Sequence, residues 1–285
     1  MPVDPGLSQR AHGVRFEWGL SGADAVVDGA DIAVIVDVLS FTTTLTVAMD
    51  AGIDVIPCRW RDDRASQLAE EFDAVLAVGR SAGSPGRISL CPASIRNTPP
   101  PARLVLPSPN GSTIAYELAS RAGLCVGASL RNAAAVAKWI RAQNPTAVIA
   151  VIASGERWPD ASLRPAVEDL WGAGAVIAEL LDSGAADASA EAVAAAAAWR
   201  AVKQGVASEL LRCASGQELN TMGHPEDVVI AAETGSSGCV PLLRDGMFVD
   251  ATRRRNSSTD DRGFDRELKR RTDTADDVRY LDRDP

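Results

Sequence analysis

Three parts of the chain repeat one order of hydrophobic and polar positions. In each part, a short apolar run rich in β-branched residues leads through a polar loop into a segment whose apolar residues recur at helical spacing. The paired segments are residues 30–40 with 42–52, residues 102–112 with 113–123, and residues 145–158 with 165–184. This repeated order predicts an α/β fold with a largely parallel or mixed central sheet. Each predicted helix ends at a glycine, as expected of a C-terminal cap.

Shorter apolar runs extend the predicted sheet. Strands are expected at residues 54–58, 74–78 and 124–128, which gives about six strands in all, a usual sheet size. Residues 131–145 predict a further helix, and the alanine-rich residues 186–214 predict a packing helix on propensity alone. The three strand–loop–helix units are alike in plan but not in sequence, so they indicate only a weak internal duplication.

The pattern changes at the end of the chain. Residues 252–285 are dense in mixed charges and nearly lack apolar side chains. Such a segment buries too little surface to offset the entropy of ordering it, which predicts a charged, partly disordered tail. Residues 1–251 are expected to form one compact domain.

Charge and cysteine usage narrow the partners and the compartment. The formal net charge of -9 argues against nucleic acid or an anionic membrane as a partner. Five widely spaced cysteines favour a reducing compartment, and the sequence shows no secretory signal pattern and no apolar run of membrane-spanning length. We therefore expect a cytoplasmic protein. The sequence leaves the oligomeric state open, a homo-oligomer included.

Scarce residue types exclude several chemistries. The chain has two histidines, which supply His-rich zinc sites and most histidine-based triads poorly. None of its three lysines follows a glycine loop, so a phosphate-binding loop of the Gly-Lys-Ser type is absent from the sequence. Carboxylates, hydroxyls, arginines and backbone amides remain as candidate groups.

Polar residues at the end of the first predicted strand form the first candidate site. Asp37 lies near the carboxyl end of that strand, where a buried acid needs a metal, a cation or amide donors to stay charged. Thr42, Thr43 and Thr44 open the following helix, whose free amides and hydroxyls could bind a phosphate. An N-cap cluster with Asp37 bonded to neighbouring amides is the alternative.

The loops of the other two units add candidate residues. Asn110 and Gly111 predict a turn, and Ser112 could cap the next helix; a plain turn and a ligand loop both fit. Glu168 and Asp169 fall in the first turn of the third helix, where acids commonly complement the helix dipole. Because adjacent helical residues project about 100° apart, one of the two acids can face a site.

Two weaker motifs have simpler explanations. Residues 79–83, GRSAG, fit a nucleophile elbow with Ser81 as a serine-esterase nucleophile, but the Ser-Pro-Gly that follows would stop the helix that the elbow requires. Residues 171–176, WGAGAV, resemble part of a dinucleotide-binding fingerprint, but the run lies inside a predicted helix. Close helix packing explains those glycines better.

Taken in order, the loops resemble a known family. The resemblance is carried, in order, by VDVLSFTTTLTVAMDAG, SPNGSTIAYEL, GASLRNAAAVA and VEDLWGAGAVI, and at the end by HPEDVVIAAE and GCVPLLRDGMF. From about residue 30 to about residue 250, the chain is similar to the 2-phosphosulfolactate phosphatase family. The resemblance implies a three-layer α/β/α fold and magnesium-dependent hydrolysis of a phosphate monoester of a sulfonated hydroxy acid. It places Asp37, Asn110, Asn132, Glu168 and Asp169 on the family's motif positions.

The resemblance also shows departures. Ser40 stands where the family usually has an arginine, and VGRSAG keeps Arg80 but loses the acid of the family's Gly-Glu-Arg-Gly stretch. A substrate with several negative charges needs cations, and Arg131 and Arg157 are candidate replacements.

These observations define one leading hypothesis and two alternatives. The leading hypothesis is a phosphatase for a small phosphorylated acid, with Mg²⁺ held by Asp37 and by Glu168 or Asp169 as the catalytic acids. The expected substrate-binding residues are Thr42, Thr43, Thr44, Asn110, Gly111, Ser112, Arg131, Asn132 and Arg157. A catalytically degenerate family member that binds an anion without turnover is one alternative, and an esterase that uses Ser81 is the other.

Overall fold

The computed structural model describes residues 6–60, 62–80, 86–108, 110–118, 121–185 and 187–253. The predicted tail from residue 252 lies almost entirely outside this part of the chain, and so does Ser81. The described residues up to Thr252 form one compact unit. Within them, no helix combines the length and apolarity needed to cross a membrane.

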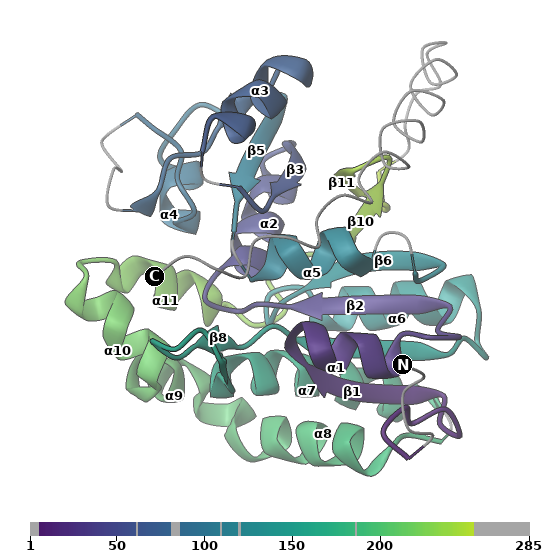
Figure 1. Ribbon diagram of the computed structural model, residues 1–285. Helices are drawn as coiled ribbons and strands as arrows, with labels where there is room; N and C mark the ends of the chain where they lie inside the picture. Colours follow the sequence, from purple (N-terminus) through teal and green to yellow (C-terminus); the bar gives the residue numbers. More distant parts are fainter. Residues whose placement is uncertain are drawn as a thin grey trace. The chain divides into compact units, whose positions relative to one another are not determined.

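A nine-stranded sheet forms the centre of the fold (Figure 1). Its order is β1-β7-β2-β6-β10-β11-β3-β5-β4. The strands are β1 (Val14–Trp18), β2 (Ile32–Val36), β3 (Asp54–Cys58), β4 (Val75–Leu76), β5 (Arg103–Pro107), β6 (Leu124–Ala128), β7 (Ile149–Ala153), β10 (Pro241–Arg244) and β11 (Met247–Asp250). A separate two-stranded ribbon pairs β8 (Glu156–Arg157) with β9 (Leu163–Arg164).

The sheet consists of two parallel blocks that run in opposite directions. β1, β7, β2 and β6 are parallel to one another, and so are β3, β5 and β4. Between the blocks lies the β10–β11 hairpin, which pairs antiparallel with β6 on one side and with β3 on the other. In Figure 1, β5 stands steeply to β2, as the twist accumulated across several strands requires. This twist brings the carboxyl end of β5 to the carboxyl end of β2.

Helices cover both faces of the first block. Side chains alternate along β2, so that Ile32, Val34 and Val36 belong to one apolar core and Ala33 and Ile35 to the other. The first core is shared with α6 (Ala133–Gln143), α7 (Val167–Asp182) and α8 (Ala190–Val202), and the second with α1 (Gly19–Val26), α2 (Phe41–Asp50) and α5 (Gly111–Leu118). The arrangement is a helix–sheet–helix sandwich, which confirms the predicted α/β fold class.

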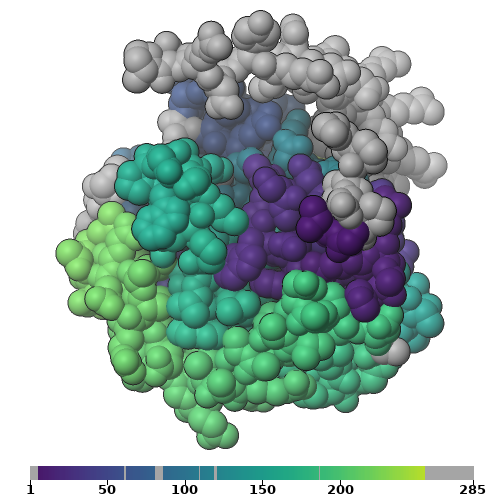
Figure 2. Space-filling model, turned by 60° about the horizontal axis from the view of Figure 1, so that its bottom comes forward, coloured from purple at the N-terminus to yellow at the C-terminus, as the bar shows by residue number. Residues whose placement is uncertain are grey.

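Shorter helices complete the unit. α3 (Asp63–Glu71) packs on β4 and β5, and α4 (Pro92–Arg96) packs on α2 and α11. The final helices are α9 (Val206–Arg212), α10 (Ala214–Thr221) and α11 (Pro225–Ala231). The alanine-rich region predicted as a single helix is divided: α8 ends before a 3-10 turn at Lys203–Gly205, and α9 follows. Figure 2 shows the purple N-terminal segment in contact with the green segment that contains α8, consistent with the packing of α8 on β1.

Two glycines confirm that close packing explains the WGAGAV run. A Cβ atom on Gly172 would lie 2.5 Å from Val38 Cγ2, and one on Gly174 would lie 2.1 Å from the carbonyl oxygen of Ala195. These glycines therefore let α7 approach the sheet and α8 directly. They lie in the middle of α7 and do not bind a dinucleotide phosphate.

Candidate active site

Asp37 lies directly after β2, and backbone amides hold its carboxylate in place. The side chain is 7% exposed, and its Oδ1 accepts a hydrogen bond of 3.0 Å from the amide of Phe41. The amide of Gly111 donates to the same carboxylate. Loops of both parallel blocks therefore fix one buried acid.

The position of Gly111 depends on its lack of a side chain. A Cβ atom there would lie 2.4 Å from Phe41 Cδ1 and 2.9 Å from Asp37 Oδ2. These distances are far below van der Waals contact, so only glycine allows the loop after β5 to reach Asp37. The predicted PSPNGST loop thus contacts the first candidate site.

Asp169 fastens two loops of the first block together. Its Oδ1 accepts from the amide of Val38 at 2.7 Å, and its Oδ2 accepts from the amide of Gly155 at 2.8 Å. Because both oxygens are engaged by the backbone, Asp169 is better placed to position the loops after β2 and β7 than to ligate a metal. This differs from the sequence expectation that it is a metal ligand.

Of the adjacent acids Glu168 and Asp169, Glu168 is the one that we group with Asp37 as a candidate metal ligand. It is 2% exposed at the start of α7, and its charge raises the pKa values of Asp37 and Asp169, which shows that the three groups lie close together. The thiol of Cys213 donates to the carbonyl of Leu210 at 3.2 Å, and burial followed by the charge of Glu168 raises the pKa of that thiol to about 12. Cys213 thus stays a neutral thiol beside the acid.

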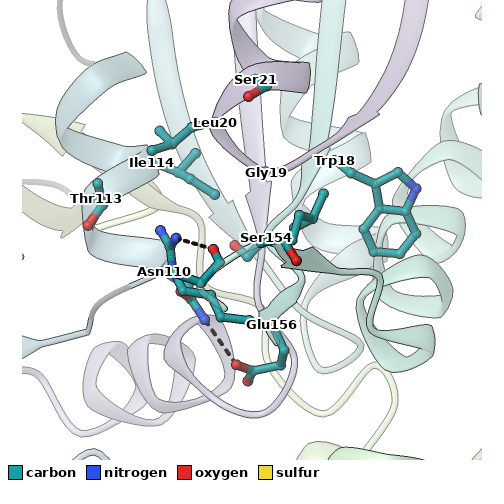
Figure 3. Close-up of a pocket in the computed structure, with 13 residues that line it drawn as sticks. Trp18, Gly19, Leu20, Ser21, Asn110, Thr113, Ile114, Ser154 and Glu156 are labelled. Atoms are coloured by element: carbon teal, nitrogen blue, oxygen red, sulfur yellow. Dashed lines mark hydrogen bonds between the residues drawn. The ribbon is translucent and has the colours of Figure 1, made fainter. Parts of the chain in front are cut away.

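Glu156 is a fourth acid of the cluster, and sequence reasoning missed it. It lies in β8, just after β7, and its Oε2 accepts a hydrogen bond of 3.1 Å from Asn110 Nδ2. The signal that could have identified it is the one used for Asp37: an acid that follows a buried strand. Figure 3 shows Asn110 beside Glu156. The neighbouring Arg157 donates to Asn110 Oδ1 at 3.4 Å, so Asn110 bridges Glu156 and Arg157.

Burial, and after it neighbouring negative charge, raises the pKa values of three of these acids. Burial, with a smaller contribution from Glu168, raises the pKa of Asp37 to about 6, against the opposing effects of the Phe41 amide and Arg80. Burial and then the charges of Asp37 and Glu168 raise the pKa of Glu156 to about 7. Burial and the same two charges raise the pKa of Asp169 well above its usual value.

Arg80 brings positive charge to the site from the loop after β4. Its Nη2 donates to the hydroxyl of Ser40, and its charge lowers the pKa of Asp37. Its Nε lies 3.6 Å from Asp227 Oδ2. The position at which the related family usually has an arginine therefore holds a serine that contacts an arginine from another loop.

Two cavities meet at Asn110 and Glu156, which line both. The main cleft, of about 860 Å³, is also lined by Asp37, Ser40 and Arg80. The side pocket, of about 330 Å³, lies between α1, α5 and the β8–β9 ribbon (Figure 3). The hydroxyl of Ser154 lines the side pocket, is buried, and has no hydrogen-bond partner within the described residues. Glu156 thus lies where two spaces that could hold a small molecule meet, and Asp37 lines the larger of them.

The three threonines do not form the expected cradle. All are fully buried; Thr42 Oγ1 donates to the carbonyl of Asp37, and Thr44 Oγ1 donates to the carbonyl of Leu90. The hydroxyl of Thr43 is buried without a hydrogen-bond partner in the described part of the chain. Thr42 stabilises the turn between β2 and α2, and the amide of Phe41 donates to Asp37, which is close to the alternative of an N-terminal cluster with Asp37 bonded to amides.

Three further candidates are held inside the fold. Arg131 is 3% exposed and donates to Thr46 Oγ1 at 2.7 Å and to Asp50 Oδ2 at 3.0 Å. Asn132 is fully buried and donates to the carbonyl of Cys239, and the hydroxyl of Ser112 donates to the carbonyl of Leu106. The structure therefore engages these three side chains within the protein, and their binding of substrate stays a prediction.

The acidic cluster fits a hard divalent cation. Asp37 and Glu168 are buried and Glu156 is partly buried, while Arg80 opposes the raised pKa of Asp37 and Arg164 that of Glu156. Oxygen ligands with surplus negative charge suit Mg²⁺, which keeps several waters and uses one or two carboxylates together with substrate phosphate oxygens.

Comparison with known proteins agrees with this geometry. The family described as 2-phosphosulpholactate phosphatase matches residues 23–246. A protein of Methanothermobacter thermautotrophicus named 2-phosphosulfolactate phosphatase is 29% identical over 78% of this chain and 90% of its own length. Proteins named as probable 2-phosphosulfolactate phosphatases from Thermus thermophilus and a Synechococcus species are 30% and 31% identical, over 75% and 74% of this chain and 88% of each relative.

Proposed function

Because the chain belongs to the 2-phosphosulpholactate phosphatase family, we propose that it is a magnesium-dependent phosphatase that hydrolyses a phosphate monoester of a small anionic hydroxy acid. The observation that carries the proposal is that the buried acids Asp37 and Glu168 lie near Glu156, which lines both cavities. Burial and then neighbouring negative charge raise the pKa values of Asp37 and Glu156, which favours a site built for a cation.

Asp37 and Glu168 are the residues that would hold the Mg²⁺ ion. Amides of Phe41 and Gly111 fix the carboxylate of Asp37, and Glu168 is buried at the start of α7. A bound magnesium ion would neutralise charge on the phosphoryl oxygens. Asp169 would hold the loops after β2 and β7 in position, because its carboxylate accepts hydrogen bonds from the amides of Val38 and Gly155.

Glu156 is the group that would move a proton. Its pKa of about 7 lies near neutral pH, where a carboxyl group can both accept and donate a proton. Asn110 Nδ2 holds its Oε2 and leaves the other oxygen free of this bond. Glu156 could therefore deprotonate an attacking water or protonate the leaving alcohol.

Arg80 and Arg157 are the cations that would bind the anionic substrate. Arg80 lines the main cleft together with Ser40, and Arg157 lines the side pocket beside Asn110. A substrate that spans the junction could contact both guanidinium groups, one through its phosphate and the other through its acid group. The arrangement supplies cationic contacts despite the serine at position 40.

Phosphate release from 2-phosphosulfolactate and from a panel of phosphorylated hydroxy acids, with and without Mg²⁺, tests the proposal. We expect turnover with Mg²⁺ and its loss in Asp37→Asn. Asp182→Asn is the matched control, because Asp182 is an exposed acid at the opposite end of α7 that pairs with Arg200. Binding of these compounds without turnover would support the degenerate alternative and overturn the proposed activity.

The proposed substrate is a small metabolite, so we also propose that the protein acts in the cytoplasm. The support is that all five cysteines are free and buried, as is typical of a reducing compartment. Detection of a tagged chain in fractionated cells would test this location.

A further inference from the structure

A second group of possible ligand side chains lies behind Arg80, apart from the acidic cluster. Cys91, His224 and Asp227 each offer one ligand atom, and these atoms all lie within 4.8 Å of one another. Cys91 precedes α4, whereas His224 and Asp227 belong to the start of α11. None of the three lines either cavity of the active site.

From this geometry, we propose that Cys91, His224 and Asp227 bind a zinc-class transition-metal ion. Cys91 Sγ lies 3.7 Å from His224 Nδ1. A tetrahedral zinc ion with a bond of about 2.3 Å to sulfur and about 2.0 Å to nitrogen places these two atoms about 3.6 Å apart. The observed separation therefore matches the spacing that the metal requires.

An unsatisfied carboxylate oxygen independently points to a ligand. Asp227 is 1% exposed, and its Oδ2 is buried without a hydrogen-bond partner in the described residues. Arg80 Nε forms an ion pair with this oxygen at 3.6 Å, which is beyond hydrogen-bond distance, and the Nε also lacks a hydrogen-bond partner within the described residues. Since a buried carboxylate oxygen without a hydrogen bond is costly, a directly bound cation would satisfy it.

The two helices that carry the ligands are fastened to each other. Arg96 at the end of α4 donates through both terminal nitrogens to the carboxylate of Glu233, two residues beyond α11, at 2.7 and 2.5 Å. A bidentate pair of this kind restricts movement between the helices. The three ligands are therefore held close together before a metal binds, which lowers the entropic cost of coordination.

The ligand types select the metal. One thiolate, one imidazole and one carboxylate suit Zn²⁺ or Co²⁺, whereas Mg²⁺ prefers oxygen ligands alone. With three protein ligands, a fourth position stays open for water. The proposed ion therefore differs in chemistry from the one assigned to Asp37 and Glu168.

Cobalt titration of the whole chain in excess Mg²⁺ tests the site. Mg²⁺ occupies the carboxylate site, so a thiolate-to-cobalt absorption band reports Co²⁺ at a cysteine. We expect one equivalent of Co²⁺ to produce this band, Cys91→Ser to remove it, and His224→Asn to weaken Co²⁺ binding by at least about tenfold. Cys58→Ser and His12→Asn, which change a second buried thiol and the other histidine, should leave it unchanged.

A melting experiment keeps the test decisive if Cys91→Ser does not fold. Zn²⁺ should raise the Tm of the original chain and of His12→Asn, because a ligand that binds only the folded state stabilises it. It should raise the Tm of His224→Asn much less. Absence of the cobalt band in the original chain, a band that survives Cys91→Ser, or equal Zn²⁺ stabilisation of the two histidine variants would overturn the proposal.

Discussion

Arg80 donates a hydrogen bond from its guanidinium to the hydroxyl of Ser40. The two residues come from the loops after β4 and β2, which belong to the oppositely running blocks of the sheet. The contact places a positive charge at the main cleft without an arginine at position 40.

Arg80→Lys should weaken substrate binding more than it slows turnover. Lysine keeps the charge but loses the planar donor set that reaches Ser40. Loss of a hydrogen bond to a charged group costs about 1.5–3 kcal/mol, so KM should rise about ten- to a hundredfold. Steady-state kinetics provide the measurement, with Arg121→Lys, which alters an exposed pair with Asp24, as the control. An unchanged KM would remove Arg80 from the substrate site.

Gly111→Ala should damage the site through Asp37. The added methyl group would overlap the ring of Phe41 and crowd Asp37 Oδ2, so the loop after β5 must retreat and withdraw its amide. We expect a loss of about 1–3 kcal/mol in the free energy of unfolding together with lower magnesium-dependent turnover. Chemical denaturation and activity assays measure the two effects.

Gly238→Ala is the matched control for that variant, because a Cβ atom at Gly238 meets nothing within 4 Å. Equal behaviour of the two variants would show that the close contact at Gly111 is unimportant.

Asp169→Asn should act on stability, whereas Asp37→Asn should act on metal binding. An asparagine at position 169 turns an amide donor toward one of the backbone amides of Val38 and Gly155, which costs about 1–3 kcal/mol. Thermal melts should therefore show the larger drop in Tm for Asp169→Asn. Calorimetric titration with Mg²⁺ should show the larger drop in affinity for Asp37→Asn, and the reverse order would exchange the two roles.

The raised pKa values of Asp37 and Glu156 predict a pH-dependent stability of the metal-free protein. Folding raises the pKa of Asp37 from 3.8 to about 6 and that of Glu156 from 4.5 to about 7, so the folded state binds protons that the unfolded chain has released. The two groups therefore favour folding most at low pH, and this contribution is lost as the pH rises through about 6 and 7. The decrease in Tm over this range should be smaller in Glu156→Gln than in the original chain.

Magnesium binding should follow the opposite trend over the same window. A cation competes with the protons on these carboxyl groups, so Mg²⁺ affinity should increase as the pH rises through about 6 to 7. Titrations on both sides of the window measure the effect. A constant affinity would show that Asp37 and Glu156 do not share the ion's environment.

Local sequence patterns predicted the helices and strands better than they predicted the contacts between these elements. The alternation of apolar runs located β2, β5 and β7 and the helices that follow them, because each is stabilised by its own hydrophobic periodicity. The β10–β11 hairpin was missed although Asp245 and Gly246, both with positive φ, supplied the usual hairpin turn signal.

The same contrast applies to the site residues: local sequence could identify single acids, but not the roles that depend on distant partners. Asp37 was identifiable as an acid after a buried strand, and Glu156 carried the same signal one unit later. The roles of Arg131 and Asp169 were not identifiable, because their partners, Asp50 and Val38, are distant in sequence. Only the folded chain shows whether a polar side chain is free for a ligand or already engaged by the protein.

The central place of the β10–β11 hairpin affects when the site can form during synthesis. These strands end at Asp250, yet they join the block that carries Asp37 to the block that carries Gly111. A nascent chain can build each half-sheet on the ribosome but cannot join them until its last strands have emerged. Until these strands have emerged, the sheet lacks the hairpin that joins the block of Asp37 to the block whose loop carries Gly111.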